Sequence, residues 1–366
     1  MTIGDAVSLI GSSLPIELMA DKDNVGLIAG NYDDECGRIS VTYELNREVI
    51  NEAVRNQVDL LVTYHTPIYR AVKSLTTSIS HPNSLLEAVR SKLSVFAIHT
   101  ALDVVKGGLN FDLAERLNLK RLRFLSPLRD TLFKVVVFVP ESHAELVRQE
   151  MSAAGAGRIG NYSNCSFSVD GGGTFLAGEA TSPFVGEMGK LEFVNETRIE
   201  FVVEKHLLNA VLNAMLDAHP YEEVAYDIYQ VGNLSSNLGF GVVGELEKPE
   251  GIREFLTRLK NRLQLDFVKL SRFPNDKVTT IALCAGAGYA YYSDAVKARA
   301  DVFITGDIKH HDFREAQLHS TVLVDATHQG TERFVQELMH RLIGKIFEGK
   351  AEVESSEQRL ENALVF

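Results

Sequence analysis

Several histidines and carboxylates come directly after short apolar segments of this sequence. Imidazole nitrogens and carboxylate oxygens together suit borderline or hard divalent ions, namely zinc, manganese, iron or magnesium. Four such side chains, delivered by three separate segments, predict a divalent-metal site more strongly than any one of them. The candidate ligands are His65, Asp103, His328 and Glu332.

Four segments that end in histidines or carboxylates, among them those that carry the candidate ligands, have the pattern of buried strands. Residues 59–64, 94–98, 301–305 and 321–325 are apolar runs of strand length, and polar residues follow each of them. In an open parallel sheet, ligands bind outside the carboxyl ends of the strands. We therefore expect the polar residues that follow these four strands to meet at one edge.

Each candidate also has an ordinary structural explanation. Asp103 could start a turn before Gly107 and Gly108, and a single histidine at a strand end is usually a surface or capping residue. Glu332 could favour the positive end of a helix dipole, and His328 with Glu332 could be a simple i,i+4 helix pair. It is the combination that favours the metal site.

The elements around these residues alternate between strand and helix. This rhythm in the first and last thirds of the chain predicts an α/β fold with a mainly parallel sheet. A polar tail at 351–366 should be loosely held. We expect strands at 38–45, 59–64, 94–98, 279–284, 301–305 and 321–325, and helices at 1–15, 46–56, 83–92, 293–299 and 331–347.

The middle of the chain has a different order. Strands at 133–139, 165–169, 198–203 and 225–229 and helices at 142–154 and 205–218 give β-α-β-β-α-β, the ferredoxin-like pattern. We place this insert at 131–231, between a first core half at 1–130 and a second at 232–366. The core must be discontinuous, because the proposed ligands of the two halves have to meet across the insert.

Two further motifs leave alternatives open. The glycines of residues 284–288 could form an anion-binding nest for a phosphate or only a tight turn. Residues 23–27, with sequence DNVGL, could line the site or could be only a turn.

Composition narrows the class of protein. A formal net charge of −12 over 366 residues disfavours general nucleic-acid binding. Three distant cysteines suggest neither disulfides nor a thiolate zinc site, so a reducing cytoplasm fits. The sequence contains no apolar run of the roughly 18 residues that a membrane helix needs, and its start does not have the pattern of a signal peptide.

Taken together, the motifs resemble the Nif-three-like family, whose members are also called GTP cyclohydrolase type 2 homologues and have a dinuclear metal centre. The resemblance covers essentially the full chain, and in the middle region it extends to the PII/CutA-like insert of the longer bacterial members. The matching core segments are DNVGL (23–27), YHTPIYR (64–70), HTALDVVKGGLN (99–110), TGDIKHHD (305–312) and DATHQGTE (325–332).

The resemblance implies a ligand set and an assembly. The family's metal ligands fall on His65, Asp103, His328 and Glu332, with up to two ions per chain. The family core dimerises and forms toroidal hexamers, and inserts of this type tend to form trimers, so a homo-hexamer is implied.

Tyr64 stands where the family usually has another histidine. A protonated phenol binds divalent metals poorly, so we expect unequal metal sites, one of them weak. The alternative is that Tyr64 binds as a phenolate whose pKa two nearby cations have lowered.

The function that we expect is metal-dependent hydrolysis of a nucleotide or phosphorylated small molecule, the family name suggesting GTP ring opening. His99 would be an acid/base or supporting group, and Tyr64 could hold a water or a substrate oxygen. The alternative is a non-catalytic metal-binding scaffold or regulator that senses a ligand or partner through its insert. Open coordination positions would distinguish the two functions.

Overall fold

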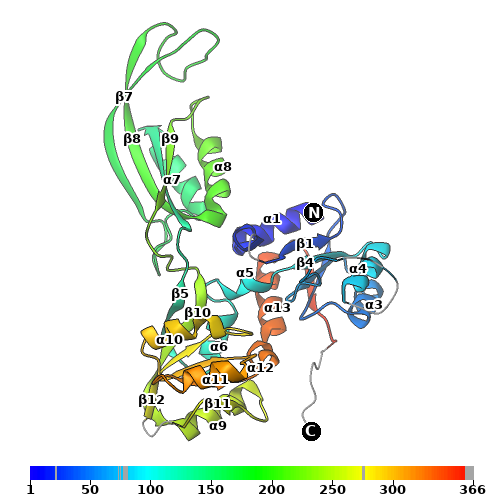
Figure 1. Ribbon diagram of the computed structural model, residues 1–366. Helices are drawn as coiled ribbons and strands as arrows, with labels where there is room; N and C mark the ends of the chain where they lie inside the picture. The colour runs from blue at the N-terminus through cyan, green and yellow to red at the C-terminus, as the bar shows by residue number, and fades with distance from the viewer. Residues whose placement is uncertain (21–22, 73, 75, 77–80, 274–276, 359–366) are drawn as a thin grey trace. The chain divides into compact units, whose positions relative to one another are not determined.

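The computed structural model describes residues 1–20, 23–72, 74, 76, 81–273 and 277–358, without the side chains of 81–83. The chain forms two compact units. The first, here the core, combines Met1–Pro127 with Leu238–Phe366, and the second, here the insert unit, is Leu128–Asn237 (Figure 1). The range expected from the sequence for this insert is 131–231.

The first sheet of the core has five strands in the order β1-β4-β3-β2-β15. All neighbours are parallel except the antiparallel pair β1 and β4. Every residue of β3 and β4 is buried, and helices α3 and α4 pack on one face of these two strands (Figure 1). Helix α13 contacts the neighbouring strand β2. The strands are β1 Gly26–Ala29, β2 Arg38–Thr42, β3 Leu60–Thr63, β4 Ser94–Ala97 and β15 Glu352–Ser355.

The second sheet of the core has six strands in the order β11-β14-β13-β12-β10-β5. Strands β12, β13 and β14 are parallel, and the other pairs are antiparallel. Alternate residues of β13 face opposite layers: Ile304 packs with α6 and α9, and Phe303 packs with α10 and α11. The strands are β5 Lys120–Pro127, β10 Gly239–Gly251, β11 Lys269–Leu270, β12 Lys277–Leu283, β13 Val302–Thr305 and β14 Val322–Asp325.

Local capping fixes where several core helices begin. The Asn46 side chain accepts a hydrogen bond from Val49 N at the start of α3, and Thr2 with Asp5 forms a capping box at α1. The core helices are α1 Ile3–Ser13, α2 Ile16–Ala20, α3 Arg47–Arg55, α4 His81–Arg90, α5 His99–Asp103, α6 Leu109–Arg116, α9 Ile252–Leu263, α10 Tyr292–Lys297, α11 His310–Ala316, α12 His328–Glu332 and α13 Val335–Ile346, with a 3₁₀ turn at Tyr289–Tyr291.

The insert unit is a four-stranded antiparallel sheet in the order β7-β8-β6-β9. Its element order is β6-α7-β7-β8-α8-β9, and valines of β6 pack against both helices. Strands β7 and β8 form a long hairpin (Figure 1). The elements are β6 Leu132–Pro140, α7 Ala144–Ala153, β7 Ser166–Leu176, β8 Leu191–Glu204, a 3₁₀ turn at Lys205–Leu207, α8 Leu208–Ala218 and β9 Tyr226–Val231.

Three expectations from the sequence need correction. The four strands expected to meet at one edge belong to two sheets, because β3 and β4 lie in the first and β13 and β14 in the second. The helix expected at 331–347 is divided into α12 and α13. The tail expected to be loosely held contains β15, which pairs in parallel with β2; residues 359–366 lie outside the described part of the chain.

Candidate metal centre

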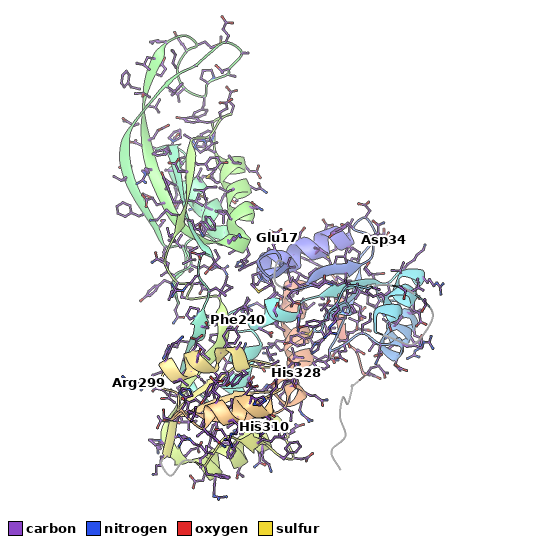
Figure 2. The ribbon with its side chains drawn as sticks, in the orientation of Figure 1. Glu17, Asp34, Phe240, Arg299, His310 and His328 are labelled. Atoms are coloured by element: carbon purple, nitrogen blue, oxygen red, sulfur yellow. The ribbon has the colours of Figure 1, made fainter. Side chains whose placement is uncertain are left out.

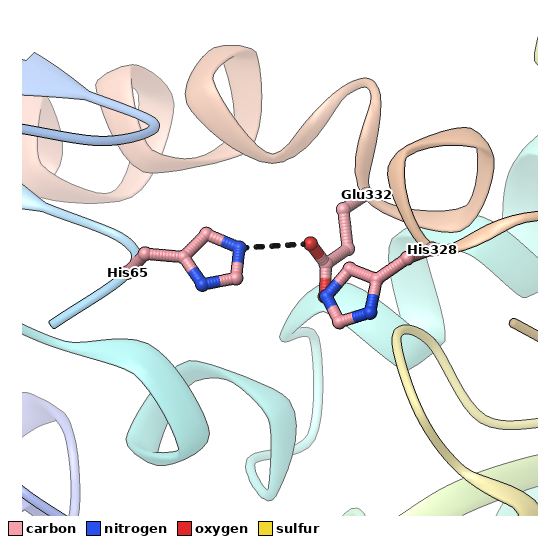
Figure 3. Close-up of side chains that lie close together, drawn as sticks. All are labelled: His65, His328 and Glu332. Carbon is pink, nitrogen blue, oxygen red and sulfur yellow. Dashed lines mark hydrogen bonds and ion pairs between the residues drawn. The ribbon is translucent and has the colours of Figure 1, made fainter. Parts of the chain in front are cut away.

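Three of the expected ligands meet in the core. His65 Nε2 lies 3.1 Å from Glu332 Oε2, and His328 Nε2 lies 3.1 Å from Glu332 Oε1. The ligand atoms of these three side chains all lie within 4.8 Å of one another. Figure 3 shows the two imidazoles on either side of the Glu332 carboxylate. This spacing would allow one cation to contact all three side chains.

Parallel pairing that continues past the strand ends positions His65. Tyr64 N donates to Thr42 O, and His65 N donates to Tyr43 O, so the chain after β3 stays beside the chain after β2. On the other side, His99 N donates to Tyr64 O. The side chains after three neighbouring strands are therefore held next to one another.

His328 and Glu332 come from a single helical turn. Both lie in α12, whose i,i+4 spacing puts them on one face, and the Thr327 side chain caps this helix by accepting from Gly330 N. Glu332 is only 3% exposed. The turn after β12 lies against this carboxylate. A Cβ at its Gly286, whose φ is +65°, would lie 2.6 Å from Glu332 Oε1, so position 286 needs glycine.

Three residues of the site have a left-handed backbone conformation. His99, Asp307 and Thr327 have φ values of 28°, 54° and 62°. Left-handed φ is costly for residues with a side chain, and most of all for a β-branched residue such as threonine. Such residues cluster at functional sites, where the surrounding structure holds them in place.

A charged pair stabilises the centre. Hydrogen bonding to Glu332 is the largest cause that raises the pKa of His328 to about 9. Burial would raise the pKa of Glu332, but hydrogen bonds from His328 and His65 lower it to about 2. The remaining nitrogen of His328, Nδ1, lies 2.7 Å from Asp307 Oδ2, which directs Nε2 toward Glu332.

Tyr43 belongs to the centre, and the sequence reasoning missed it. Its hydroxyl donates to Glu332 Oε2 over 2.7 Å. Burial, and then the Glu332 carboxylate, raise the pKa of Tyr43 far above its usual range, so it stays a donor. Its position directly after β2 was the available signal, because β2 neighbours the strand that carries His65.

Asp103 is linked to the three ligands through the hydroxyl of Tyr64. Tyr64 is 1% exposed, and its hydroxyl donates to Asp103 Oδ1 over 2.9 Å and lies 3.5 Å from Glu332 Oε1. Burial is the largest cause that raises the pKa of Asp103 to about 7, although His99 opposes it. Among the described residues, Asp103 is not in the group whose ligand atoms lie within 4.8 Å. Tyr64 connects it to that group.

His99 is held by Asp23, the first residue of the DNVGL motif. His99 Nδ1 lies 2.6 Å from Asp23 Oδ2, and that oxygen also accepts from Thr100 Oγ1 over 2.7 Å. Burial would raise the pKa of Asp23, but these hydrogen bonds, led by the one to His99, lower it to about 2. The His99 ring centroid is 5.3 Å from that of His65. This motif therefore lines the site.

Two other candidate segments have different roles. His310 (Figure 2) and its neighbour His311 lie on α11, and both are exposed. In the glycine segment, Ala285 N donates to Asn110 Oδ1 and Gly286 N to Thr331 Oγ1. Because these amides are already bonded, they do not form a phosphate nest, and the tight-turn alternative holds.

No helix in the described part of the chain has the length and apolar character needed to cross a membrane.

A family model and individual relatives of known sequence both match this chain over most of its length. The model of the Duf34/NIF3 (NGG1p interacting factor 3) family matches residues 1–361. A Bacillus subtilis protein called GTP cyclohydrolase 1 type 2 homolog is 36% identical over 88% of this chain and 87% of its own length. A Halalkalibacterium halodurans protein of the same name is 34% identical over 92% of this chain and 90% of its own length.

Solved structures agree. A Bacillus cereus protein related to NIF3 superposes with a TM-score of 0.86 and 31% identity, covering 100% of this chain and 99% of its own. A Staphylococcus aureus protein superposes with a TM-score of 0.73 and 26% identity, with the same coverage of both chains. With a family model across almost the whole length and relatives above 30% identity, this chain belongs to the Duf34/NIF3 family.

Proposed function

We propose that this protein binds divalent metal through His65, His328 and Glu332, with Asp103 beside them, and hydrolyses a nucleotide or phosphorylated small molecule. The observation that carries the proposal is the convergence of three ligand atoms within 4.8 Å, from segments far apart in the sequence. A mixed imidazole and carboxylate donor set fits zinc, manganese or iron, and magnesium less closely.

The donor set favours catalysis over a closed structural site. Structural zinc sites are filled by four protein ligands, whereas catalytic sites keep a position for water or substrate. Three convergent ligands, with Asp103 reached through the Tyr64 hydroxyl, leave such a position. A bound divalent ion lowers the pKa of its water toward about 7 and polarises the attacked group.

The surrounding side chains provide orientation and a proton carrier. Tyr43 fixes one Glu332 oxygen, and Tyr64 fixes Asp103. His99 is the acid/base group of the proposal, because Asp23 holds its Nδ1 and leaves Nε2 to exchange a proton with substrate or water. Burial would lower the pKa of His99, but the hydrogen bond to Asp23 raises it above its ordinary value.

Two relatives carry the name GTP cyclohydrolase 1 type 2 homolog, so GTP is the first substrate to test. We extend the proposal to a second metal bound near Asp103, with Tyr64 making that site the weaker one. The chain's partners would then be the small-molecule substrate and further copies of itself in a homo-hexamer, in the cytoplasm and without nucleic acid.

The insert unit supports a second candidate, a metal-binding regulator that senses a ligand. We propose that the unit is a ferredoxin-like domain, which its β-α-β-β-α-β order and its sheet order support. A cavity within this unit favours the sensing function. The two candidates differ in one property, which is turnover at the metal centre.

The test is metal analysis followed by a turnover screen. Purified protein should contain divalent metal, and His328→Ala and Glu332→Ala should each lose most of it. His311→Ala is the matched control, because His311 is an exposed histidine on α11, and this variant should keep its metal. Metal retained in both site variants would refute the centre. Bound metal without turnover of GTP, other nucleotides or phosphoesters would favour the regulator.

A further inference from the structure

A cavity of about 710 Å³ lies within the insert unit, and the proposed metal chemistry does not use it. This volume is in the range of small-molecule sites. Strand β6 pairs with β8 only over Glu196–Glu204, so the hairpin residues 191–195 and 172–176 extend past it. The cavity is lined by the β7–β8 hairpin, the segment after β7 and the segment before β9.

Aromatic rings line the cavity at angles to one another. The Tyr221 centroid lies 6.2 Å from that of Phe184 and 6.5 Å from that of Phe175, with interplanar angles of 49° and 56°. Phe184 is 50% exposed, although it also contacts His143 edge-on. Phe138 is a further ring in the lining, so a guest in this cavity would have several aromatic rings to contact.

The polar lining is mainly acidic. Glu196, Glu222 and Glu223 line the cavity, whereas Asp170 borders it on the other strand face and accepts from Thr197 Oγ1. Arg198, which is ion-paired with Glu200, is the one basic residue among the described lining residues. The Tyr221 hydroxyl donates to Glu196 Oε1 over 3.1 Å, which fixes a carboxylate beside the rings. Aromatic faces together with carboxylates attract an organic cation and disfavour a phosphate.

Strand β7 has glycines beside the cavity at positions where a larger side chain would not clash with the rest of the unit. Gly171 and Gly172 are within β7, neither has a left-handed φ, and a Cβ at either would meet nothing within 4 Å. Glycine weakens a strand interior and often marks the close approach of a ligand or another backbone. Successive strand residues point to opposite faces, and Gly171 is the one paired with Glu196, so the open space at Gly171 lies on the face that carries Glu196.

We propose that this cavity binds a small organic ammonium ion of the quaternary class, with Tyr221, Phe175 and Phe184 contacting the cation and Glu196 supplying the counter-charge. Aromatic groups of this kind recognise quaternary ammonium through the negative faces of their rings. The proposal does not depend on the metal centre, because no expected metal ligand lies in Leu128–Asn237.

Calorimetric titration of the full-length protein tests the proposal with a matched pair of probes. Choline and 3,3-dimethylbutan-1-ol have the same shape and differ in the central charge. Choline should bind, and the neutral alcohol should bind at least about tenfold more weakly. Adenosine monophosphate and manganese(II) should not displace choline. Equal binding of both shapes, displacement by either ion, or no choline binding up to about 10 mM would overturn the proposal.

Three variants locate the site. Glu196→Gln should weaken choline binding about tenfold and leave the alcohol unchanged, because glutamine still accepts the Tyr221 hydrogen bond but has no charge. Gly171→Leu should abolish binding by filling open space. Gly232→Leu is the control, because Gly232 also has open space around it but does not line the cavity.

Unchanged choline affinity in Gly171→Leu would refute the location. Sedimentation velocity of the same variant tests the remaining alternative. A change in its assembly state relative to wild type would show that this surface binds another copy of the chain, and would overturn the ligand site.

Discussion

Glu332 accepts hydrogen bonds from groups on separate segments of the core. His65, His328 and Tyr43 each lie within 3.1 Å of one of its oxygens, and the Tyr64 hydroxyl lies at 3.5 Å. A buried carboxylate is stable only when it is paired and hydrogen-bonded. The donors therefore stabilise the charge before any ion arrives, and they hold the carboxylate in the orientation that a cation would need.

Tyr64 tests how far the phenol takes part in metal binding. Tyr64→Phe should leave metal content nearly unchanged, because burial, followed by the Asp103 and Glu332 charges, raises the pKa of this phenol well above its usual range. Tyr64→His should raise the metal content toward two ions per chain. Equilibrium dialysis with metal quantification measures both. Two tight ions in wild type, with one lost in Tyr64→Phe, would show that the phenolate is a ligand.

A second residue-scale prediction concerns His206 in the insert unit. Burial lowers the pKa of this imidazole from 6.5 to about 4, and its Nδ1 has no hydrogen-bond partner among the described residues. The unfolded chain therefore takes up a proton as pH falls below about 6.5, and the folded chain does not until about pH 4. Between pH 7 and pH 5 this difference should cost about 2 kcal/mol of stability.

His206→Leu removes this group and should reduce the loss of thermal stability between pH 7 and pH 5. The exposed His311→Leu is the control and should behave as wild type. Glu204, whose pKa burial raises, acts in the opposite direction as pH falls, but it is present in all three proteins. Equal pH dependence in His206→Leu and wild type would contradict the prediction.

At the scale of elements, β15 shows how a polar segment becomes part of the core. Glu352–Ser355 pairs with β2, and Glu52 of α3 then accepts hydrogen bonds from Ser356 Oγ at 2.6 Å and Glu357 N at 2.8 Å. Glu52 is 7% exposed. A helix of the first core half therefore holds the chain end of the second half.

Glu52→Ala should lower the free energy of unfolding by roughly 1–3 kcal/mol, because the buried Ser356 hydroxyl and the Glu357 amide lose their acceptor. Urea denaturation measures the loss, and hydrogen exchange should increase first at residues 352–357. Glu48→Ala, at an exposed site on the same helix, should change stability little. Unchanged exchange at these residues in Glu52→Ala would show that β15 is held by its strand pairing alone.

The same contrast between local and distant contacts explains what the sequence could predict. His65, His328 and Glu332 follow apolar strands, so their meeting could be inferred from strand ends alone. The role of Tyr43 depends on β2 lying beside β3, and a local sequence pattern does not predict which strands are neighbours. Strand β15 is four residues of mixed polarity, and its partner β2 is more than three hundred residues away, so periodicity could not find it.

The break between α12 and α13 has a similar origin. The apolar positions Leu338, Met339 and Ile343 correctly indicated one buried helix face. The turn that carries His328 and Glu332 is a separate helix, because Phe334, at a φ of −100° and a ψ of 7°, leaves the helical conformation before α13 begins. A hydrophobic period shows which face is buried, but it does not show where the backbone changes direction.

At the scale of the whole molecule, each core half contributes to the other half's sheet. Strand β5 of the first half is part of the six-stranded sheet, and helix α6 of the same half packs against it. Strand β15 of the second half joins the five-stranded sheet. The proposed metal centre takes His65 from the segment after a strand of one sheet, and His328 and Glu332 from the segment after a strand of the other. Neither half can therefore form the centre alone.

The insert leaves and re-enters this core at neighbouring points. Pro127 ends β5 and is paired with Gly239 of β10, so the two chain ends that flank Leu128–Asn237 lie side by side in an antiparallel ladder. Paired residues in such a ladder are about 5 Å apart, a distance that a short turn bridges. An insertion with adjacent ends leaves the host core intact when it is removed.

Replacing Leu128–Asn237 by a short glycine–serine turn should therefore give a folded core that binds as much metal per chain as the full-length protein. All candidate ligands lie outside this range, and none of the hydrogen bonds described for the centre comes from it. Circular dichroism and metal analysis measure fold and content, and light scattering should show a smaller assembly than the proposed hexamer. The same deletion carrying His328→Ala is the control and should contain little metal.

A folded deletion protein without metal would mean that the insert unit helps to form the centre. A full-length protein that is monomeric by light scattering would refute the proposed assembly.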